Sequence, residues 1–305
     1  MPALVRPFKR FLVHVDVTAS AQPALQRIVQ LTKGTRAQVR LVDVIPADIT
    51  RTPLRGLVNG VVRDTLADFV EEARRHGLRA TSKILQGDPA TALIAEAVAW
   101  RADVLLRSHS VRRGPVQPTG PIDGEVLRRC PCPVWIVTPR QAKGEGVIVA
   151  AVDPEPSDPA RHDLSLRVAA AAAQLAEARG VTLHLVHAWN AFGHQVLASH
   201  ATEEQLQAHY DACREHAETR FAALLEDLEL PKDAKTHLLE GVSDKVIAKF
   251  VERRKASLVV MGTVGRTGLA GLIMGNTAER VIRQVRCSVL AFKPTGFAAE
   301  SPEVP

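Results

Sequence analysis

Among the residue patterns of this sequence, the spacing of three glycines after an apolar segment is the one most typical of a binding site. Gly262 and Gly265 come after the run Leu-Val-Val-Met, and Gly275 precedes a segment that is predicted to begin a helix. Glycine lets backbone N–H groups approach an anion closely, and a helix N-terminus adds unpaired N–H groups and a favourable dipole. The segment therefore predicts a phosphate-binding loop, with turn formation and helix capping as the alternative role. The chain has neither the P-loop pattern nor the GxGxxG dinucleotide fingerprint.

Alternating strands and helices are predicted to position this loop. Short apolar or β-branched segments predict five strands in the second half of the chain, and amphipathic segments between them predict four helices. Strands joined by helices form a parallel sheet, which binds ligands beyond the carboxyl ends of its strands where the strand order reverses. The predicted strands are 147–152, 181–188, 235–239, 258–261 and 288–292, and the predicted helices are 161–179, 202–228, 243–255 and 276–285.

The chain contains this pattern twice. Segment 102–139 aligns without gaps to 257–294 at an offset of 155 residues, and the strand that ends at Asp16 is repeated by one that ends at Asp153. We therefore predict an α/β protein with two tandem, doubly wound, parallel five-stranded sheets. The predicted boundaries are 1–140 for the first domain (the first half), 146–296 for the second domain (the second half) and 297–305 for a tail.

The composition excludes several protein classes. The chain of 305 residues is 46% hydrophobic and 24% charged, which is ordinary for a soluble globular protein, and its longest apolar runs are too short to span a bilayer. Four cysteines fit a reducing cytoplasm better than a disulfide scaffold, and 4% aromatic residues argue against nucleic-acid binding by base stacking. Residues 1–143 carry 22 Lys and Arg against 12 Asp and Glu, whereas residues 144–305 carry 17 against 21. This difference in charge has three possible interpretations: the first half binds an anionic partner, the halves attract each other, or their solvated surfaces simply differ in charge.

Two groups of metal-binding or redox-active residue types are assigned structural roles. His209, Cys213 and His216 fall on one face of a predicted helix, but no fourth ligand is identifiable from the spacing. A polar helix face is therefore favoured over a metal site, and metal binding stays open. Cys132 aligns with Cys287 at the start of a strand, so packing is favoured over redox chemistry.

The glycine loop and its flanking segments resemble a known family. The pattern G-x2-G-x9-G after a strand ending at Met261, the Asp that closes the first strand, and a last strand ending in Lys293-Pro294 are similar to the universal stress protein family. Two copies in one chain resemble the tandem, E-type members, and the resemblance covers essentially the whole chain. It implies that the second half binds ATP, with or without Mg²⁺.

The resemblance also implies which residues form the nucleotide site. Asp153 would contact the ribose or adenine side, backbone atoms near Ala188 would hold the adenine edge, and the loop glycines would approach the phosphates. The family's ATP binders usually have a hydroxyl residue directly after the third glycine and another two positions later, where this chain has Asn276 and Ala278. The full set of implied residues is Asp153, Ala188, Met261, Gly262, Gly265, Gly275, Asn276 and Thr277.

The first half departs further from the family pattern. Arg107 and Ser110 are aligned with the first two glycines, only Gly120 is retained, and Pro121 removes an N–H group that the second half would offer. We therefore predict a degenerate copy that binds no ATP. Its basic residues Arg107, Arg112 and Arg113 either bind another anion or belong to a solvated loop.

The resemblance implies a cytoplasmic stress-response protein that acts as an ATP-dependent switch or adaptor for a protein partner. The halves are expected to pack as an internal pseudo-dimer through their last strands, and further homodimerisation stays open. No nucleophile and base can be paired from spacing, so no catalytic residue is assigned and ATP hydrolysis is expected to be slow or absent. The alternatives are a slow ATPase and a scaffold whose basic first half binds an anion or lipid without a nucleotide. No membrane span and no nucleic-acid partner are predicted.

Overall fold

The computed structural model describes residues 8–19, 21–32, 37–50, 52–108, 120–139, 146–191, 193, 200–263 and 274–297. The strands are β1 (Arg10–His14), β2 (Gln38–Ile45), β3 (Arg79–Gln86), β4 (Val104–Ser108), β5 (Val134–Val137), β6 (Ile148–Val152), β7 (Leu183–Trp189), β8 (Lys235–Glu240), β9 (Leu258–Gly262) and β10 (Ser288–Phe292). The helices are α1 (Pro23–Leu31), α2 (Ala47–Thr50), α3 (Arg55–Arg75), α4 (Pro89–Ala99), α5 (Pro121–Arg129), α6 (Pro159–Arg179), α8 (Glu203–Glu226), α9 (Ser243–Arg253) and α10 (Asn276–Gln284).

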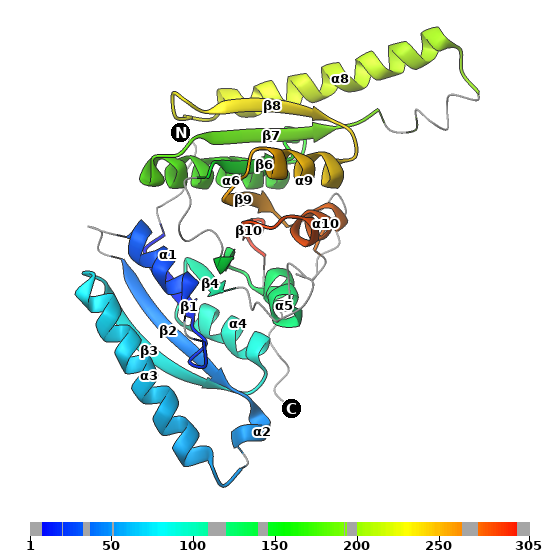
Figure 1. The fold of residues 1–305 in the computed structure, drawn as a ribbon. Coiled ribbons are helices and arrows are strands. Elements are labelled where there is room, and N and C mark those ends of the chain that lie inside the picture. Colours follow the sequence, from blue (N-terminus) through cyan, green and yellow to red (C-terminus); the bar gives the residue numbers. More distant parts are fainter. Residues whose placement is uncertain are drawn as a thin grey trace.

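The ten strands form one sheet in the order β3-β2-β1-β4-β5-β10-β9-β6-β7-β8 (Figure 1). Within each half all neighbouring strands are parallel, as predicted, and the halves meet at one antiparallel pair, β5 and β10. The order in the second half mirrors that in the first. The two predicted five-stranded sheets are therefore joined edge to edge into one sheet, with the last strand of each half at the joint.

Helices cover both faces of the sheet (Figure 1), and each face has its own hydrophobic core. One core contains residues of α1, α3, α6 and α8, and the other contains residues of α4, α5, α9 and α10. Successive strand residues alternate between the cores because side chains of a strand point to opposite faces: Val260 belongs to the first, whereas Val259 and Met261 belong to the second. The nearly continuous apolar strands noted in the sequence are the consequence of this burial on both faces.

Local sequence signals account for several helix ends. Asp158 accepts hydrogen bonds from the N–H groups of Ala160 and Arg161 and so caps the start of α6, and Gly180 ends the same helix in a left-handed conformation with φ of 61°. In the second half every predicted strand and helix begins and ends within two residues of the observed element. Within the described residues, no helix combines the length and the apolarity that crossing a bilayer requires.

Candidate functional site

Three residues that the sequence assigned to the nucleotide site lie at the ends of neighbouring strands. Gly262 is the last residue of β9, Asp153 follows β6 directly, and Ala188 is the next-to-last residue of β7. Strand β6 lies between β9 and β7, and the strand order of the second half reverses between β6 and β9. The three residues therefore lie at the carboxyl edge of the sheet, beside the point where doubly wound sheets bind ligands.

The two ends of the glycine loop are held together. The buried Thr263 donates from its backbone N–H and from Oγ1 to the carbonyl oxygen of Phe292, at 3.0 and 3.1 Å. The N–H of Gly275 in turn donates to the carbonyl oxygen of Thr263 at 2.7 Å. Helix α10 therefore begins next to the end of β9, at the same edge as Asp153. Gly265 lies outside the described residues.

The start of α10 leaves backbone donors without a side-chain cap. Gly275 is the N-cap residue and makes no side-chain capping bond, and the first two helical residues, Asn276 and Thr277, are exposed. An uncapped, exposed helix start offers N–H groups and the positive end of the helix dipole to an anion. This arrangement can bind a phosphate group through backbone hydrogen bonds and the helix dipole.

Two other predicted site residues are constrained by packing. A Cβ atom on Gly262 would lie 2.7 Å from Cδ2 of the buried Leu164, so a larger residue here would require the Leu164 side chain to shift. The side chain of Met261 is buried in the core. Met261 can therefore reach a ligand only through its backbone.

Asp153 belongs to a network of charged side chains. Its Oδ2 lies 2.7 Å from Nη2 of Arg161 at the start of α6, and its Oδ1 lies 3.4 Å from Nη2 of Arg220 on α8. Both arginines also approach Glu155, at 3.6 and 3.5 Å, and Nε of Arg220 donates to the carbonyl oxygen of Pro154 at 2.7 Å. The Asp153 side chain is 52% exposed, so its orientation is fixed while it stays accessible to a ligand.

The first half has a different arrangement at the corresponding edge. Phe11 on β1 pairs with Val104, and its counterpart on β6, Ile148, pairs with Leu258. Strands β4 and β9 are therefore equivalent at an offset of 154 residues, whereas the gapless alignment used 155. The offset of 155 remains correct from Gly120 onward. The loop of the first half is one residue shorter than that of the second half. The alignment was thus wrong at Arg107, which takes the place of Met261, and Ser108 takes the place of Gly262.

Arg107 and Asp123 form a buried ion pair in this place. They are 5% and 0% exposed, their side chains are in direct contact, and their counterparts in the second half are the apolar residues Met261 and Ala278. The other oxygen of Asp123 accepts a hydrogen bond from the N–H of Gly120 at 3.0 Å. The sequence left two roles open for Arg107, binding of an external anion or a solvated loop, and both are wrong because the guanidinium is buried against a carboxylate. Ser110, Arg112 and Arg113 lie outside the described residues.

The polar residues next to this pair also contact one another. Nε2 of His14 lies 3.7 Å from Oδ1 of Asp43, and burial, followed by the charge of Arg107, lowers the pKa of His14 to about 4. Burial raises the pKa of Asp43. His14 is therefore neutral at pH 7.

The helix residues considered as metal ligands are not arranged around a common point. Sγ of Cys213 lies 3.8 Å from Nε2 of His209, but the described part of the chain contains no group of three His, Cys, Asp or Glu side chains that could hold a metal ion. The four cysteines are free thiols, and burial raises the pKa of Cys287 to about 12, which agrees with a packing role.

Sequence reasoning missed three residues of these sites. Asp123 could have been found by comparing the halves, because an acid stands where the second half has alanine at the third position of the helix. Arg161 follows Asp153 by eight residues but has no recognisable motif. Arg220 lies 67 residues from Asp153 and is brought to it only by the packing of α8.

The fold and the strand-edge site define a protein of two doubly wound α/β domains that share one sheet. The model of the Universal stress protein family matches residues 7–138 and 146–293. The chain therefore belongs to the universal stress protein family, as a tandem, two-domain member.

Similar proteins cover almost the whole chain. It is 28% identical over 309 residues to Universal stress protein E of Photorhabdus laumondii, covering 95% of this chain and 96% of the relative. It is 29% identical over 307 residues to Universal stress protein E of Escherichia coli (strain K12), covering 95% of each chain. A crystal structure of a functionally unknown protein from Pseudomonas aeruginosa superposes with a TM-score of 0.71 at 26% identity, covering 96% of this chain and 95% of that one.

Proposed function

We propose that the second half binds ATP and that the protein acts in the stress response of the cytoplasm as an ATP-dependent switch or adaptor for a protein partner. The observation that carries this proposal is the uncapped start of α10, which is held against the end of β9 at the point of strand reversal. Membership of the universal stress protein family supports the role in stress.

Each part of the nucleotide has a corresponding group in the proposed site. The phosphates, with or without Mg²⁺, meet the N–H groups at Asn276 and Thr277, close to Gly262 and Gly275. The carboxylate of Asp153, oriented by its two arginines, accepts hydrogen bonds from the ribose hydroxyls. The adenine edge pairs with backbone atoms near Ala188, and Met261 contributes through its backbone.

The proposed stoichiometry is one ATP per chain. In the first half the carboxylate of Asp123 already accepts from the helix N-cap N–H, so the start of α5 holds an internal anion. A phosphate placed there would meet this negative charge, although Arg107 balances it in part. The second half has Ala278 in the corresponding position and so leaves its helix start open.

Asn276→Asp tests this proposal without weakening the fold. A carboxylate at the first residue of α10 stabilises the helix through its dipole but repels phosphate, so ATP affinity should fall by about tenfold or more. Thermal unfolding should show an unchanged or higher Tm, and isothermal titration calorimetry should give one site in the unmodified chain. Gly265→Val should also abolish ATP binding. Undiminished affinity in the Asn276→Asp variant, or two ATP per chain, would overturn the assignment.

The enzyme alternative lacks a supporting observation at the site. Both carboxylate oxygens of Asp153 are engaged by arginines, which disfavours its use as a general base towards water. We therefore expect phosphate release to be absent or far slower than about 1 per second, the lower end of ordinary enzymes.

A further inference from the structure

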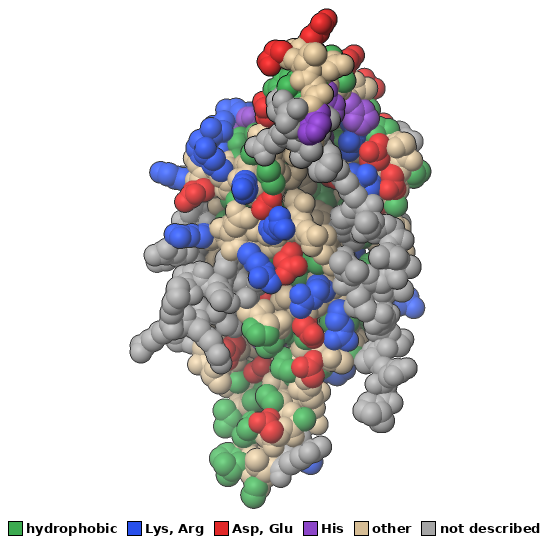
Figure 2. Space-filling view, turned by 90° about the vertical axis from the view of Figure 1, so that its right-hand side faces the viewer, with side chains coloured by type: hydrophobic (Ala, Val, Ile, Leu, Met, Phe, Trp, Pro, Cys, Tyr) green, Lys and Arg blue, Asp and Glu red, His purple; other side chains and the backbone are tan. Residues whose placement is uncertain are grey.

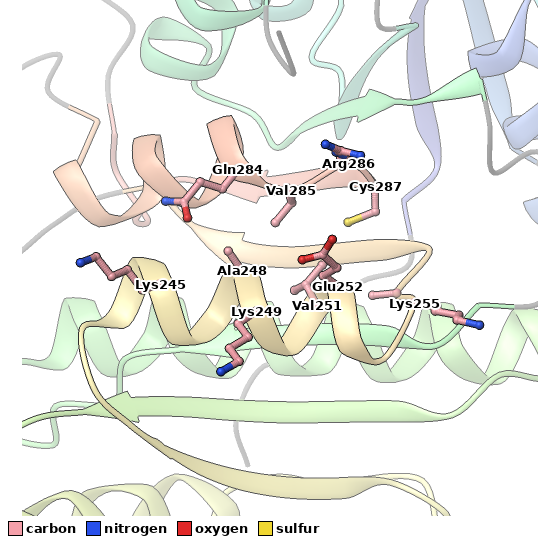
Figure 3. Close-up of a pocket in the computed structure, with 11 residues that line it drawn as sticks. Lys245, Ala248, Lys249, Val251, Glu252, Lys255, Gln284, Val285, Arg286 and Cys287 are labelled. Atoms are coloured by element: carbon pink, nitrogen blue, oxygen red, sulfur yellow. The ribbon is translucent and has the colours of Figure 1, made fainter. Parts of the chain in front are cut away.

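A groove lies along α9 in the second half, apart from the residues of the proposed nucleotide site. It runs between α9 and the segment that joins α10 to β10, and its volume is about 530 Å³ (Figure 3). Its residues Lys255 and Ala256 precede β9, and Val285, Arg286 and Cys287 precede β10. The groove therefore runs along α9 from Lys245, the third residue of this helix, to the amino ends of β9 and β10, whereas Gly262 and Asn276 lie at the carboxyl edge of the sheet.

The groove has an apolar floor. Val251 and Val285 are buried in the hydrophobic core and still line the groove, as does the half-buried Ala248. Figure 3 shows Ala248 and Val251 on the side of α9 that faces α10. At one end Nε2 of Gln284 donates to Oδ2 of Asp244 at 3.3 Å, which joins the two walls. A ligand in the groove would therefore meet apolar surface below it, with α9 on one side and the segment that joins α10 to β10 on the other.

The rim of the groove is basic. Lys245, Lys249, Lys255 and Arg286 are exposed, and none of them forms an ion pair with any residue that the structure describes. Glu252 is the single acidic residue of the lining. In Figure 3, Lys245 and Lys255 lie at opposite ends of α9, with Glu252 between them. Four cations and one carboxylate give the groove a net positive charge. Figure 2 shows Lys and Arg side chains mixed with Asp and Glu side chains over the middle of one face of the molecule.

The duplication shows that the fold does not require these charges. The counterparts of Lys245, Lys249 and Arg286 in the first half are Thr91, Ala95 and Pro131, and only Lys255 has a basic counterpart, Arg101. The second half as a whole has more acidic than basic residues, so the positive charge of the groove is opposite in sign to the net charge of its domain. A charge pattern that differs from both the duplicate and the surroundings indicates a ligand of opposite charge.

We propose that this groove binds a small organic anion that carries an apolar group, such as an aryl sulfonate, carboxylate or phosphate ester. Its volume falls within the range of about 300–1,000 Å³ that is usual for small-molecule sites. The apolar group lies on Ala248, Val251 and Val285, and the anionic group is attracted by the net positive charge of the rim. The groove shares no lining residue with the proposed nucleotide site.

The charge dependence of binding by a named probe tests the proposal. The probe is 8-anilinonaphthalene-1-sulfonate, whose fluorescence rises on binding to apolar surface, titrated into the full-length protein. Lys245→Gln with Lys249→Gln should weaken binding by about fivefold, and Glu252→Gln should strengthen it by about threefold, because the first change removes attraction and the second removes repulsion. Arg63→Gln, which removes an exposed cation from α3, serves as the matched control and should leave affinity unchanged.

Two further measurements separate the groove from other apolar surfaces. The uncharged probe N-phenyl-1-naphthylamine should bind all variants equally, because charge changes act only on an anion. Binding of the sulfonate should also be unaffected by Asn276→Asp. Equal affinity of the sulfonate for the unmodified protein and the lysine double variant, or an opposite response to Glu252→Gln, would overturn the proposal. A loss of affinity caused by Asn276→Asp would place the probe at the proposed nucleotide site and overturn it as well.

Discussion

The buried pair of Arg107 and Asp123 shows how one position can change the chemistry of a duplicated fold. The second half places Met261 and Ala278 at the same two positions, so a charged contact and an apolar contact serve the same packing role. Removing one member of a buried ion pair leaves an uncompensated charge, whereas replacing both members by apolar residues is often neutral. The second half therefore provides the apolar reference against which the contribution of this ion pair to the free energy of unfolding can be measured.

Asp123→Ala should lower the free energy of unfolding by about 3–5 kcal/mol, because it leaves the Arg107 guanidinium buried without its carboxylate. The double variant Arg107→Met with Asp123→Ala, which copies the second half, should recover most of this loss. Urea denaturation of the three proteins measures the difference. A double variant less stable than Asp123→Ala would show that the pair does not behave as a replaceable unit.

The proposed contact between Asp153 and the ribose hydroxyls can be tested separately from the rest of the nucleotide. If its carboxylate accepts from the ribose hydroxyls, Asp153→Asn should weaken ATP binding by roughly tenfold, since hydrogen bonds to charged groups contribute about 1.5–3 kcal/mol. The same change should hardly affect 2′,3′-dideoxy-ATP, which lacks those hydroxyls. Calorimetry with both nucleotides provides the comparison. An equal loss for both would mean that Asp153 acts on the fold or on another part of the nucleotide.

At the scale of elements, periodicity and duplication predicted the alternation of strands and helices in both halves. Strands β6, β7, β9 and β10 are largely buried on both faces, and α9 and α10 have clear polar and apolar sides. Each element of the second half could be placed to within two residues. The gapless alignment failed at β4 because the loops differ by one residue, and a slip of one residue moves every side chain to the other face of a sheet. The contact of Arg220 with Asp153 was not predictable, because it depends on how α8 packs rather than on local sequence.

Buried histidines on β1 and β7 predict acid sensitivity. Burial lowers the pKa of His14 and of His184 to about 4, and His184 lies with its Nδ1 2.9 Å from Nε2 of His237, whose pKa is also lowered by burial. The unfolded chain, with His pKa values near 6.5, therefore binds more protons than the folded chain between about pH 6.5 and pH 4. The stability that the folded chain gains by keeping these histidines neutral is fully present above about pH 6.5 and is lost as the pH falls toward 4.

Urea unfolding at pH 7 and pH 5 should show a loss of stability on the order of 1–2 kcal/mol from His14, with a smaller further loss from His184. A His184→Leu variant should lose less stability over the same interval, because it removes one of the titrating groups. The His76→Gln variant, which replaces an exposed histidine outside these strands, serves as the control substitution. Equal stability at pH 7 and pH 5 would contradict the expectation.

At the scale of the whole molecule, the joint between the halves is a continuous strip of sheet. Leu290 on β10 pairs with Trp135 on β5, both are almost fully buried, and the backbone N–H of Thr138 donates to Oγ of Ser288 at 3.1 Å. One pair of charges from the two halves is repulsive: burial and the positive charge of Arg27 on α1 lower the pKa of Arg179 on α6 to about 10. Apolar burial and strand pairing therefore hold the halves together locally, although the halves differ in net charge.

A cleavage experiment distinguishes apolar association from electrostatic attraction. A protease site placed in segment 140–145 allows the full chain to fold before it is cut between the halves. After cleavage the two fragments should stay together in gel filtration at 0.1 M and at 1 M NaCl, because salt screens exposed charges over about 10 Å at 0.1 M and about 3 Å at 1 M but does not weaken apolar burial. Separation at 1 M NaCl alone would show that the unequal charges hold the halves together. Separation at both concentrations would show that the β5–β10 joint depends on the covalent connection.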